Sequence, residues 1–216
     1  MNASATPHHV VILCHPEQNS YTATVATKYC TFVEECGQIT HLRDLYRMNF
    51  DPVLRAEEQA DTTRALHSPA VVHERALIAG AAVIVLVYPI WLGSAPAMLK
   101  GYVERVFGPD FALRARAVPQ GRPCLEGKHL LSFTSSGNSK IWLDEQGQWQ
   151  SLIQVFDRYL GRAFAMASAE HVHFSPITPD MSERFFLQYM EEAGQAARQA
   201  CRTVAAGLPR RPARRG

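Results

Sequence analysis

Three short hydrophobic runs divide the chain, and they are its strongest structural signal. They cover residues 9–14, 82–88 and, more weakly, 129–134. Runs of this length that do not alternate with polar residues are typical of strands buried on both faces, as in a parallel sheet. Residues 38–42 and 169–174 are candidates for two further strands. The pattern therefore predicts a five-stranded sheet.

Segments with helical character separate these runs. The first, residues 20–35, begins beside the capping residues Asn19, Ser20 and Thr22 and ends near Gly37, a common helix stop. The others span residues 69–79, 95–107, 151–164 and 182–206. Strands that alternate with helices indicate βαβ units with right-handed crossovers. Residues 108–128, which are rich in Pro, Gly and Arg, predict a long loop.

The 216 residues show no internal repeat and no linker, so we expect one domain over residues 1–207. The formal net charge of +2 is concentrated at the end of the chain, in Arg202, Arg210, Arg211, Arg214 and Arg215. Without these arginines the body would be slightly acidic. Residues 208–216 therefore predict a basic, disordered tail rather than a nucleic-acid-binding surface.

The cysteines and the N-terminus predict a cytoplasmic location. Five cysteines are an odd number, and they show neither a C-x-x-C motif nor zinc-ligand spacing. The first residues do not resemble a signal peptide, and the longest apolar run is too short to span a bilayer. His171 and His173 share one face of a predicted strand, but no further ligand accompanies them, so we expect no metal. A hydrolase is disfavoured because no G-x-S-x-G motif is present.

Polar or aromatic loops follow three of the predicted strands. Residues 14–22 lead into a helix, whose N-terminus offers unpaired N–H groups to an anion such as phosphate. Residues 88–101 combine Pro89 with the apolar surface of Ile90, Trp91 and Leu92. Residues 133–139 include four small, hydroxyl-bearing residues and a glycine, which allow close approach of the backbone to a ligand.

Each loop alone has a simpler reading, as a helix cap, a core aromatic or an ordinary serine-rich turn. In a doubly wound sheet of order 2-1-3-4-5, however, ligands bind at the carboxyl ends of the strands, between the first and third. We therefore expect the three loops to meet. Together they predict a site for a planar, phosphorylated cofactor, although the chain has neither G-x-G-x-x-G nor a Walker motif.

Three blocks of the sequence resemble the NAD(P)H:quinone oxidoreductase family of flavodoxin-like flavoproteins. They are residues 15–22, the D-L-Y-x-x-x-F-x-P segment at residues 44–52, and residues 89–107 followed by Asp110-Phe-Ala112. The resemblance covers residues 8–175. It implies a flavodoxin-like α/β three-layer sandwich with a five-stranded parallel sheet of order 2-1-3-4-5.

The resemblance also implies a homodimer with flavin at the interface, and hydride transfer from NAD(P)H through the flavin to a quinone-type acceptor. The residues that it places at the flavin fall into three groups: His15, Asn19, Ser20 and Tyr21 around the phosphates; Pro89, Ile90, Trp91 and Leu92 beside the isoalloxazine; Thr134, Ser135, Ser136 and Gly137 at the pyrimidine edge.

The chain departs from the family where the mammalian enzymes carry a Tyr and a His that assist charge transfer. Trp142 and Gln148 stand there, so no catalytic acid or base is assigned. Trp142 is instead expected to wall the acceptor pocket. The 108–128 loop and the 89–107 block favour FAD over FMN, and neither NADH nor NADPH is preferred by any residue. The alternatives to a quinone reductase are an azo- or nitroreductase and a regulatory subunit of a potassium-efflux system.

Overall fold

The structure, a computed structural model, describes residues 6–59, 67–108, 111 and 124–207. The predicted tail at residues 208–216 lies outside these residues, as does most of the predicted 108–128 loop. Within the described part of the chain, none of the helices combines the length and hydrophobicity that a bilayer crossing requires.

Five parallel strands form one sheet in the predicted order, β2-β1-β3-β4-β5. The strands are β1 (His8–Leu13), β2 (Ile39–Asp44), β3 (Val83–Pro89), β4 (His129–Ser135) and β5 (Ser168–Phe174). The predicted fold class is confirmed. Each predicted strand is present, and its ends lie within two residues of the predicted ones.

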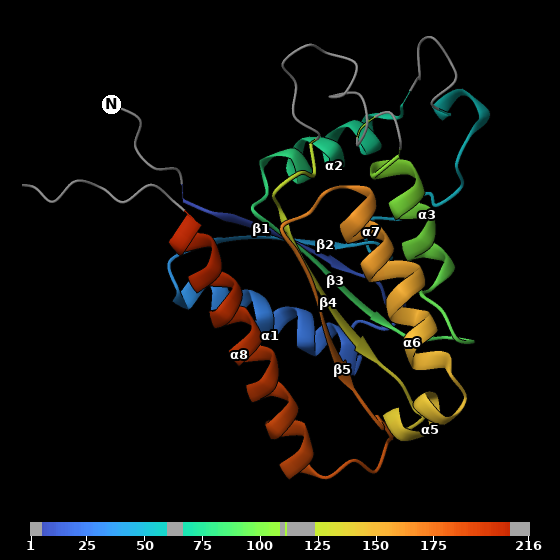
Figure 1. Ribbon diagram of the computed structural model, residues 1–216, viewed down its shortest axis with the longest axis vertical. Coiled ribbons are helices and arrows are strands. Elements are labelled where there is room, and N and C mark those ends of the chain that lie inside the picture. Colours follow the sequence, from blue (N-terminus) through green and yellow to red (C-terminus); the bar gives the residue numbers. More distant parts are fainter. Residues whose placement is uncertain (1–5, 60–66, 109–110, 112–123, 208–216) are drawn as a thin grey trace, which may run out of the picture.

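Helices cover both faces of the sheet (Figure 1). α1 (Tyr21–Glu35) and α8 (Glu183–Gly207) pack on one face. The other carries α2 (Pro69–Gly80), α3 (Ala97–Val106) and α7 (Tyr159–Ala163). A short 3-10 turn, η1 (Ala56–Glu58), precedes α2.

The predicted helix at residues 151–164 is not a single regular α-helix. It consists of α6 (Gln148–Leu152), a π-helical turn η3 (Ile153–Arg158), and α7. A short helix that the sequence pattern does not predict, α5 (Lys140–Glu145), comes before them and is capped by the Ser139 side chain. Gly147 separates α5 from α6 at φ 67°, a backbone conformation that glycine adopts without steric cost.

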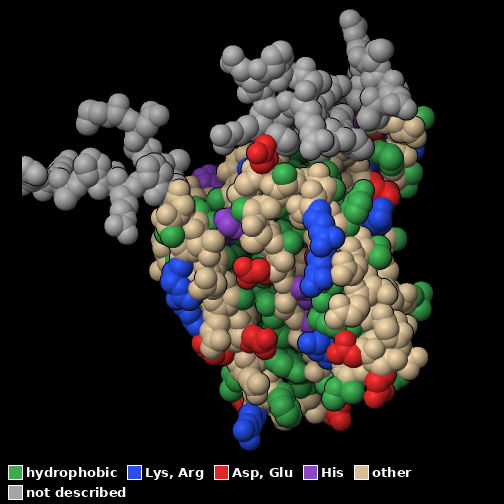
Figure 2. All heavy atoms as spheres, in the orientation of Figure 1, with side chains coloured by type: hydrophobic (Ala, Val, Ile, Leu, Met, Phe, Trp, Pro, Cys, Tyr) green, Lys and Arg blue, Asp and Glu red, His purple; other side chains and the backbone are tan. Residues whose placement is uncertain are grey.

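Burial on both faces explains why the hydrophobic runs are continuous. Along β1, Val10 and Ile12 point into the core beneath α2 and α3, whereas Val11 and Leu13 point into the core beneath α1. Successive strand residues face opposite sides of the sheet, so both must be apolar when helices cover both sides. Over the face of the molecule seen in Figure 2, acidic and basic side chains are interspersed with apolar ones.

The segment after β2 packs closely against α3. This contact joins two of the sequence blocks that carry the family resemblance, residues 44–52 and 89–107. A Cβ atom on Gly101 would lie 2.1 Å from the Pro52 carbonyl oxygen, so only glycine permits this approach. Beside it the rings of Phe50 and Tyr102 are 5.0 Å apart. Because α3 follows directly from the loop after β3, the contact also holds that loop in place.

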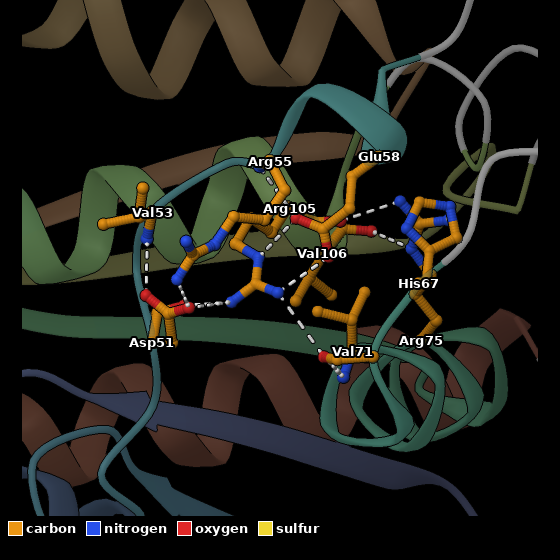
Figure 3. Close-up of polar contacts among 10 residues, drawn as sticks. Asp51, Val53, Arg55, Glu58, His67, Val71, Arg75, Arg105 and Val106 are labelled. Carbon is orange, nitrogen blue, oxygen red and sulfur yellow. Dashed lines mark hydrogen bonds and ion pairs between the residues drawn. The ribbon is translucent and has the colours of Figure 1, made fainter. Parts of the chain in front are cut away.

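A buried ion pair completes the fastening (Figure 3). The Arg105 guanidinium, 4% exposed, donates two hydrogen bonds to the Glu58 carboxylate, at 2.8 and 2.7 Å. It also donates to the backbone carbonyl of Asp51. Arg55 lies at the solvent side of the network and donates to the Asp51 carboxylate at 2.8 Å.

Candidate functional site

The loops after β1, β3 and β4 meet, as predicted, around a cleft of about 450 Å³ at the carboxyl edge of the sheet. The described residues that line it are His15, Glu17, Asn19, Ser20, Tyr21, Thr22, Pro89, Ile90, Trp91, Ser135, Ser136, Gly137, Ile177, Thr178 and Pro179. Ten of the predicted flavin-site residues are therefore brought together.

Direct contacts tie the three loops to one another. The first and second loops meet where the rings of His15 and Trp91 lie 5.6 Å apart. The second and third are joined by the Ile90 N–H, which donates to the Ser135 carbonyl at 2.8 Å. The hydroxyls of Thr22 and Ser135, 3.3 Å apart, join the first and third. These contacts hold the three loops in fixed positions relative to one another, so that together they form one wall of the cleft.

The start of α1 forms the anion-binding part of this wall. Ser20 is the N-cap, with extended backbone, and its Oγ accepts from the Ala23 N–H at 3.2 Å. The first N–H groups of a helix have no intrahelical acceptor, and the helix dipole favours negative charge there. The N–H groups of Tyr21 and Thr22 stand at this end, beside the Asn19 side chain. The arrangement suits a phosphate group.

The loop after β3 forms a tight turn in which Trp91 and Ser94 exchange two backbone hydrogen bonds, each 3.0 Å. Leu92 and Gly93 occupy the central positions with φ angles of 48° and 77°. Positive φ is unfavourable for a bulky residue such as Leu, and strained residues of this kind gather at ligand sites. The turn presents Pro89, Ile90 and Trp91 to the cleft.

Three of the predicted site residues do not line the cleft. Leu92 projects from the turn and is 107% exposed. Thr134 lies within β4 and is 1% exposed, and its hydroxyl is hydrogen-bonded to His171 and His173 on β5. Trp142, on α5, is 42% exposed. Their assignment to the flavin or the acceptor stays a prediction.

One wall of the cleft, formed by Ile177, Thr178 and Pro179 after β5, is not among the predicted site residues. The Ile177 N–H donates to the Ser136 carbonyl at 2.9 Å, which joins this segment to the loop after β4. The signal for it was present, because residues 175–179 also follow a predicted parallel strand at the same edge of the sheet.

The chemical character of the lining suits a bound cofactor better than acid–base or nucleophilic catalysis. Glu17 is the one carboxylate among the described lining residues. Burial raises the pKa of the Tyr21 phenol, which therefore remains protonated at neutral pH. Burial also raises the pKa of the nearby Cys14 thiol to about 12, so Cys14 is no nucleophile. No group of three or more metal-ligating side chains forms among the described residues.

A flavin matches this donor set in three respects. The α1 N-terminus suits its phosphate, the Pro89–Trp91 turn offers a flat apolar surface, and Ser135 to Gly137 offer backbone and hydroxyl groups to a polar ring edge. A second hollow of about 400 Å³ lies between α3 and the η3–α7 segment, and it is lined mainly by apolar side chains such as Val155 and Tyr159.

Comparison with known proteins agrees with the observed fold. A family model described as flavodoxin-like fold matches residues 7–200. An uncharacterized NAD(P)H oxidoreductase of Haemophilus influenzae is 32% identical over 146 residues, which cover 67% of this chain and 72% of that protein. The quinone-type NAD(P)H dehydrogenase 1 of Cavia porcellus is 28% identical over 154 residues, and the match covers 62% of this chain and 54% of that enzyme.

Among solved structures, the chain is similar to an NAD(P)H:quinone oxidoreductase from Methanothermobacter marburgensis. The TM-score is 0.72 at 24% identity, over 90% of this chain and 96% of the other. At that identity the likeness concerns the fold.

Proposed function

The chain belongs to the flavodoxin-like fold family, and from that premise we propose that it is an NAD(P)H-dependent flavoenzyme that reduces quinones or similar acceptors. The observation that carries the proposal is the cleft in which the α1 N-terminus, the Pro89–Trp91 turn and the Ser135–Gly137 loop converge. The sequence match to the quinone-type NAD(P)H dehydrogenase 1 of Cavia porcellus supports the choice of acceptor.

The flavin supplies the redox chemistry, a two-electron hydride transfer from nicotinamide to acceptor, and the protein supplies position and electrostatics. The α1 N-terminus with Asn19 and Ser20 binds the phosphate. Pro89, Ile90 and Trp91 support the ring system. The Trp91 side chain is 41% exposed, so the cleft is open to solvent beside it. Nicotinamide and then the acceptor bind in this open part of the cleft.

The proposed cofactor is FAD, with FMN as the alternative. The phosphate site at α1 serves either flavin, because both carry a phosphate next to the ribityl chain. The cytoplasmic location remains part of the proposal, supported by five cysteines that are all free.

We propose a homodimer as the assembly, and the apolar hollow beside α7 supports it. Val155 and Tyr159 at its rim are 73% and 63% exposed, although each is large and apolar or aromatic. Burial of this surface by a second copy would remove it from water. Light scattering should give twice the chain mass for the wild type, and Tyr159→Glu should shift the population towards monomer. A wild-type monomer at micromolar concentration would contradict the dimer.

Two other functions use the same cleft. An azo- or nitroreductase differs only in the acceptor, whereas a regulatory subunit of a potassium-efflux system would bind flavin without fast turnover.

A steady-state assay with NADPH or NADH and menadione separates these possibilities. We expect turnover by the flavin-loaded protein, with an azo dye and a nitroaromatic compound as competing acceptors in parallel assays. Flavin-loaded protein that oxidises neither nucleotide with any of these acceptors would exclude the enzyme and leave the regulatory subunit.

A further inference from the structure

A partly buried chain of hydrogen bonds runs from η3, which packs on one face of the sheet, to the wall of the cleft. Its members are Asp157 on η3, His171 and His173 on β5, and Thr134 and Ser136 on and after β4; we call these five residues the relay chain. The His171 Nδ1 lies at the Asp157 carboxylate, and its Nε2 lies 2.6 Å from the Thr134 hydroxyl. Thr134 lies 2.8 Å from His173 Nδ1, and His173 Nε2 lies 3.1 Å from Ser136 Oγ.

The hydrogen bonds of the chain can point in only one direction. Ser136 donates its hydroxyl proton to the Asn138 carbonyl at 2.7 Å, so Ser136 Oγ must accept from His173 Nε2–H. His173 Nδ1 then lacks a proton and accepts from the Thr134 hydroxyl. Thr134 in turn accepts from His171 Nε2–H, because a hydroxyl has one proton to give.

This direction places a proton between Asp157 and His171. The Asp157 carboxylate accepts from Ser132 Oγ at 2.6 Å with one oxygen and faces His171 Nδ1 with the other. Since His171 Nε2 already carries a proton, the contact at Nδ1 needs a second one, on either the ring or the carboxylate. The Asp157–His171 pair therefore holds one proton more than a neutral histidine and a carboxylate would. It forms one end of the relay chain, and Ser136 forms the other end, at the cleft.

Aromatic and basic side chains surround the two half-buried histidines. Trp149 packs against both histidines, with ring centroids 5.1 and 4.8 Å away, and the Lys140 ammonium lies over the Trp149 ring, 4.9 Å from its centroid. Burial, together with the charges of His171 and Lys140, lowers the pKa of His173 to about 4, so this ring is neutral at neutral pH.

Asp157 occupies the π-helical turn, and it is 1% exposed. Turns of this kind are frequent at functional sites. The Tyr88 phenol on β3 also faces Asp157, and burial raises its pKa well above 10, so it adds no charge.

We propose that the relay chain holds a proton and passes it to Ser136, where it neutralises the negative charge that two-electron reduction places at the polar edge of the bound flavin. This inference rests on the flavin function proposed above. It would supply charge compensation in a protein whose sequence has Trp142 and Gln148 at the positions expected for the Tyr and His of the mammalian enzymes. His171 and His173 are positioning residues in this account, because neither lines the cleft.

The proton moves by one step along each hydrogen bond. For a proton to reach the cleft, the Ser136 hydroxyl would turn from the Asn138 carbonyl towards the polar edge of a bound flavin, and His173 Nε2 would replace the proton that Ser136 gives up. His173 Nδ1 takes the Thr134 proton, and Thr134 takes the proton from His171 Nε2. The Asp157–His171 pair is then one proton poorer, and solvent restores it. No electron moves along the chain, and one proton enters the protein for each pair of electrons.

The first test is a histidine NMR spectrum of the flavin-free protein. We expect both His171 and His173 to carry a proton on Nε2 at neutral pH. His9 serves as the assignment control, since it is also buried in a strand, with partners Tyr29 and Gln38 each at 2.8 Å. Protonation of His173 at Nδ1 alone would reverse the direction of the chain and overturn the proposal without any flavin.

The second test measures the midpoint potential of the bound flavin against pH in Thr134→Val, which removes the hydroxyl between the two histidines. One proton per two electrons corresponds to about 30 mV per pH unit. Near neutral pH we expect a slope shallower by about that amount than in the wild type. Thr134→Ser, which keeps the hydroxyl, should restore the slope, and His9→Gln should leave it unchanged.

Equal slopes for the wild type and Thr134→Val, both loaded with flavin, would overturn the relay while leaving the proposed function intact. A wild-type protein that binds no flavin would instead overturn the proposed function. If Thr134→Val fails to fold, His173→Gln interrupts the same chain and is measured in the same way.

Discussion

Arg105→Met is expected to lower the free energy of unfolding by about 3–5 kcal/mol, the usual cost of removing one partner from a buried ion pair. Glu58, 4% exposed, would keep its carboxylate in the protein interior without the two hydrogen bonds from Arg105. Denaturation by urea, followed by circular dichroism, measures the change. A loss below about 1 kcal/mol would mean that the pair does not fasten the segment after β2 to α3.

Two further variants sharpen this test. Arg55→Met removes an exposed partner of Asp51 and should leave the denaturation midpoint unchanged. The double variant Glu58→Leu with Arg105→Met replaces the whole pair by apolar side chains, and it should be more stable than Arg105→Met alone. If the double variant is less stable than Arg105→Met, the cost of the single substitution does not come from the unpaired buried charge of Glu58.

The pH dependence of the Arg105→Met effect follows from Glu58. Although burial opposes ionisation, the hydrogen bonds from Arg105 hold the pKa of Glu58 below its ordinary value of 4.5. Because the pKa of Glu58 is lower in the folded than in the unfolded protein, its ionisation stabilises the fold fully above about pH 4.5. This stabilisation is lost as the pH falls through the pKa of the folded state. The difference in free energy of unfolding between the wild type and Arg105→Met should therefore shrink as the pH falls below the folded-state pKa of Glu58.

Ser20→Asp is expected to weaken flavin binding about a hundredfold without destabilising the protein. Aspartate is as good an N-cap as serine and suits the positive end of α1, so the helix keeps its cap. Its charge would stand where the flavin phosphate binds. A repulsion of about 2.8 kcal/mol, within the range for two charges near 4 Å at a protein surface, corresponds to that loss. Quenching of flavin fluorescence on titration measures the Kd.

The controls for Ser20→Asp separate the phosphate from the rest of the flavin. Riboflavin, which has no phosphate, should bind the wild type and Ser20→Asp equally. Ser182→Asp places the same charge before α8, where the Ser182 hydroxyl accepts from the Phe185 N–H, and should bind FMN and FAD like the wild type. If Ser20→Asp binds FMN and FAD as tightly as the wild type does, the flavin phosphate does not bind at the N-terminus of α1.

The sheet and most of the cleft could be predicted from the sequence because both follow from local rules. Continuous apolar runs identify strands covered on both faces, and the residues after such strands share one edge of the sheet. Ser20, Trp91 and Ser136 were found in this way. The same rule, applied to the strand at residues 169–174, would have found Thr178 as well.

The remaining errors have physical causes that a linear pattern hides. Thr134 belongs to β4, which continues to Ser135, and the two-residue period of a strand puts the Thr134 side chain on the face opposite to that of Ser135. Leu92 points to solvent because its turn takes positive φ. The contact between Asp157 and His171 depends on a π-helical turn, for which the sequence has no signal.

Flavin loading measures the central claim most directly. The purified protein is saturated with FAD and FMN together, passed through a desalting column and denatured, and the released flavin is identified by its mass and quantified. A parallel sample receives NADPH or NADH without oxygen. We expect one flavin per chain, and bleaching of its visible absorption by nicotinamide nucleotide. Protein that retains no flavin, or flavin that neither nucleotide bleaches, would contradict the account.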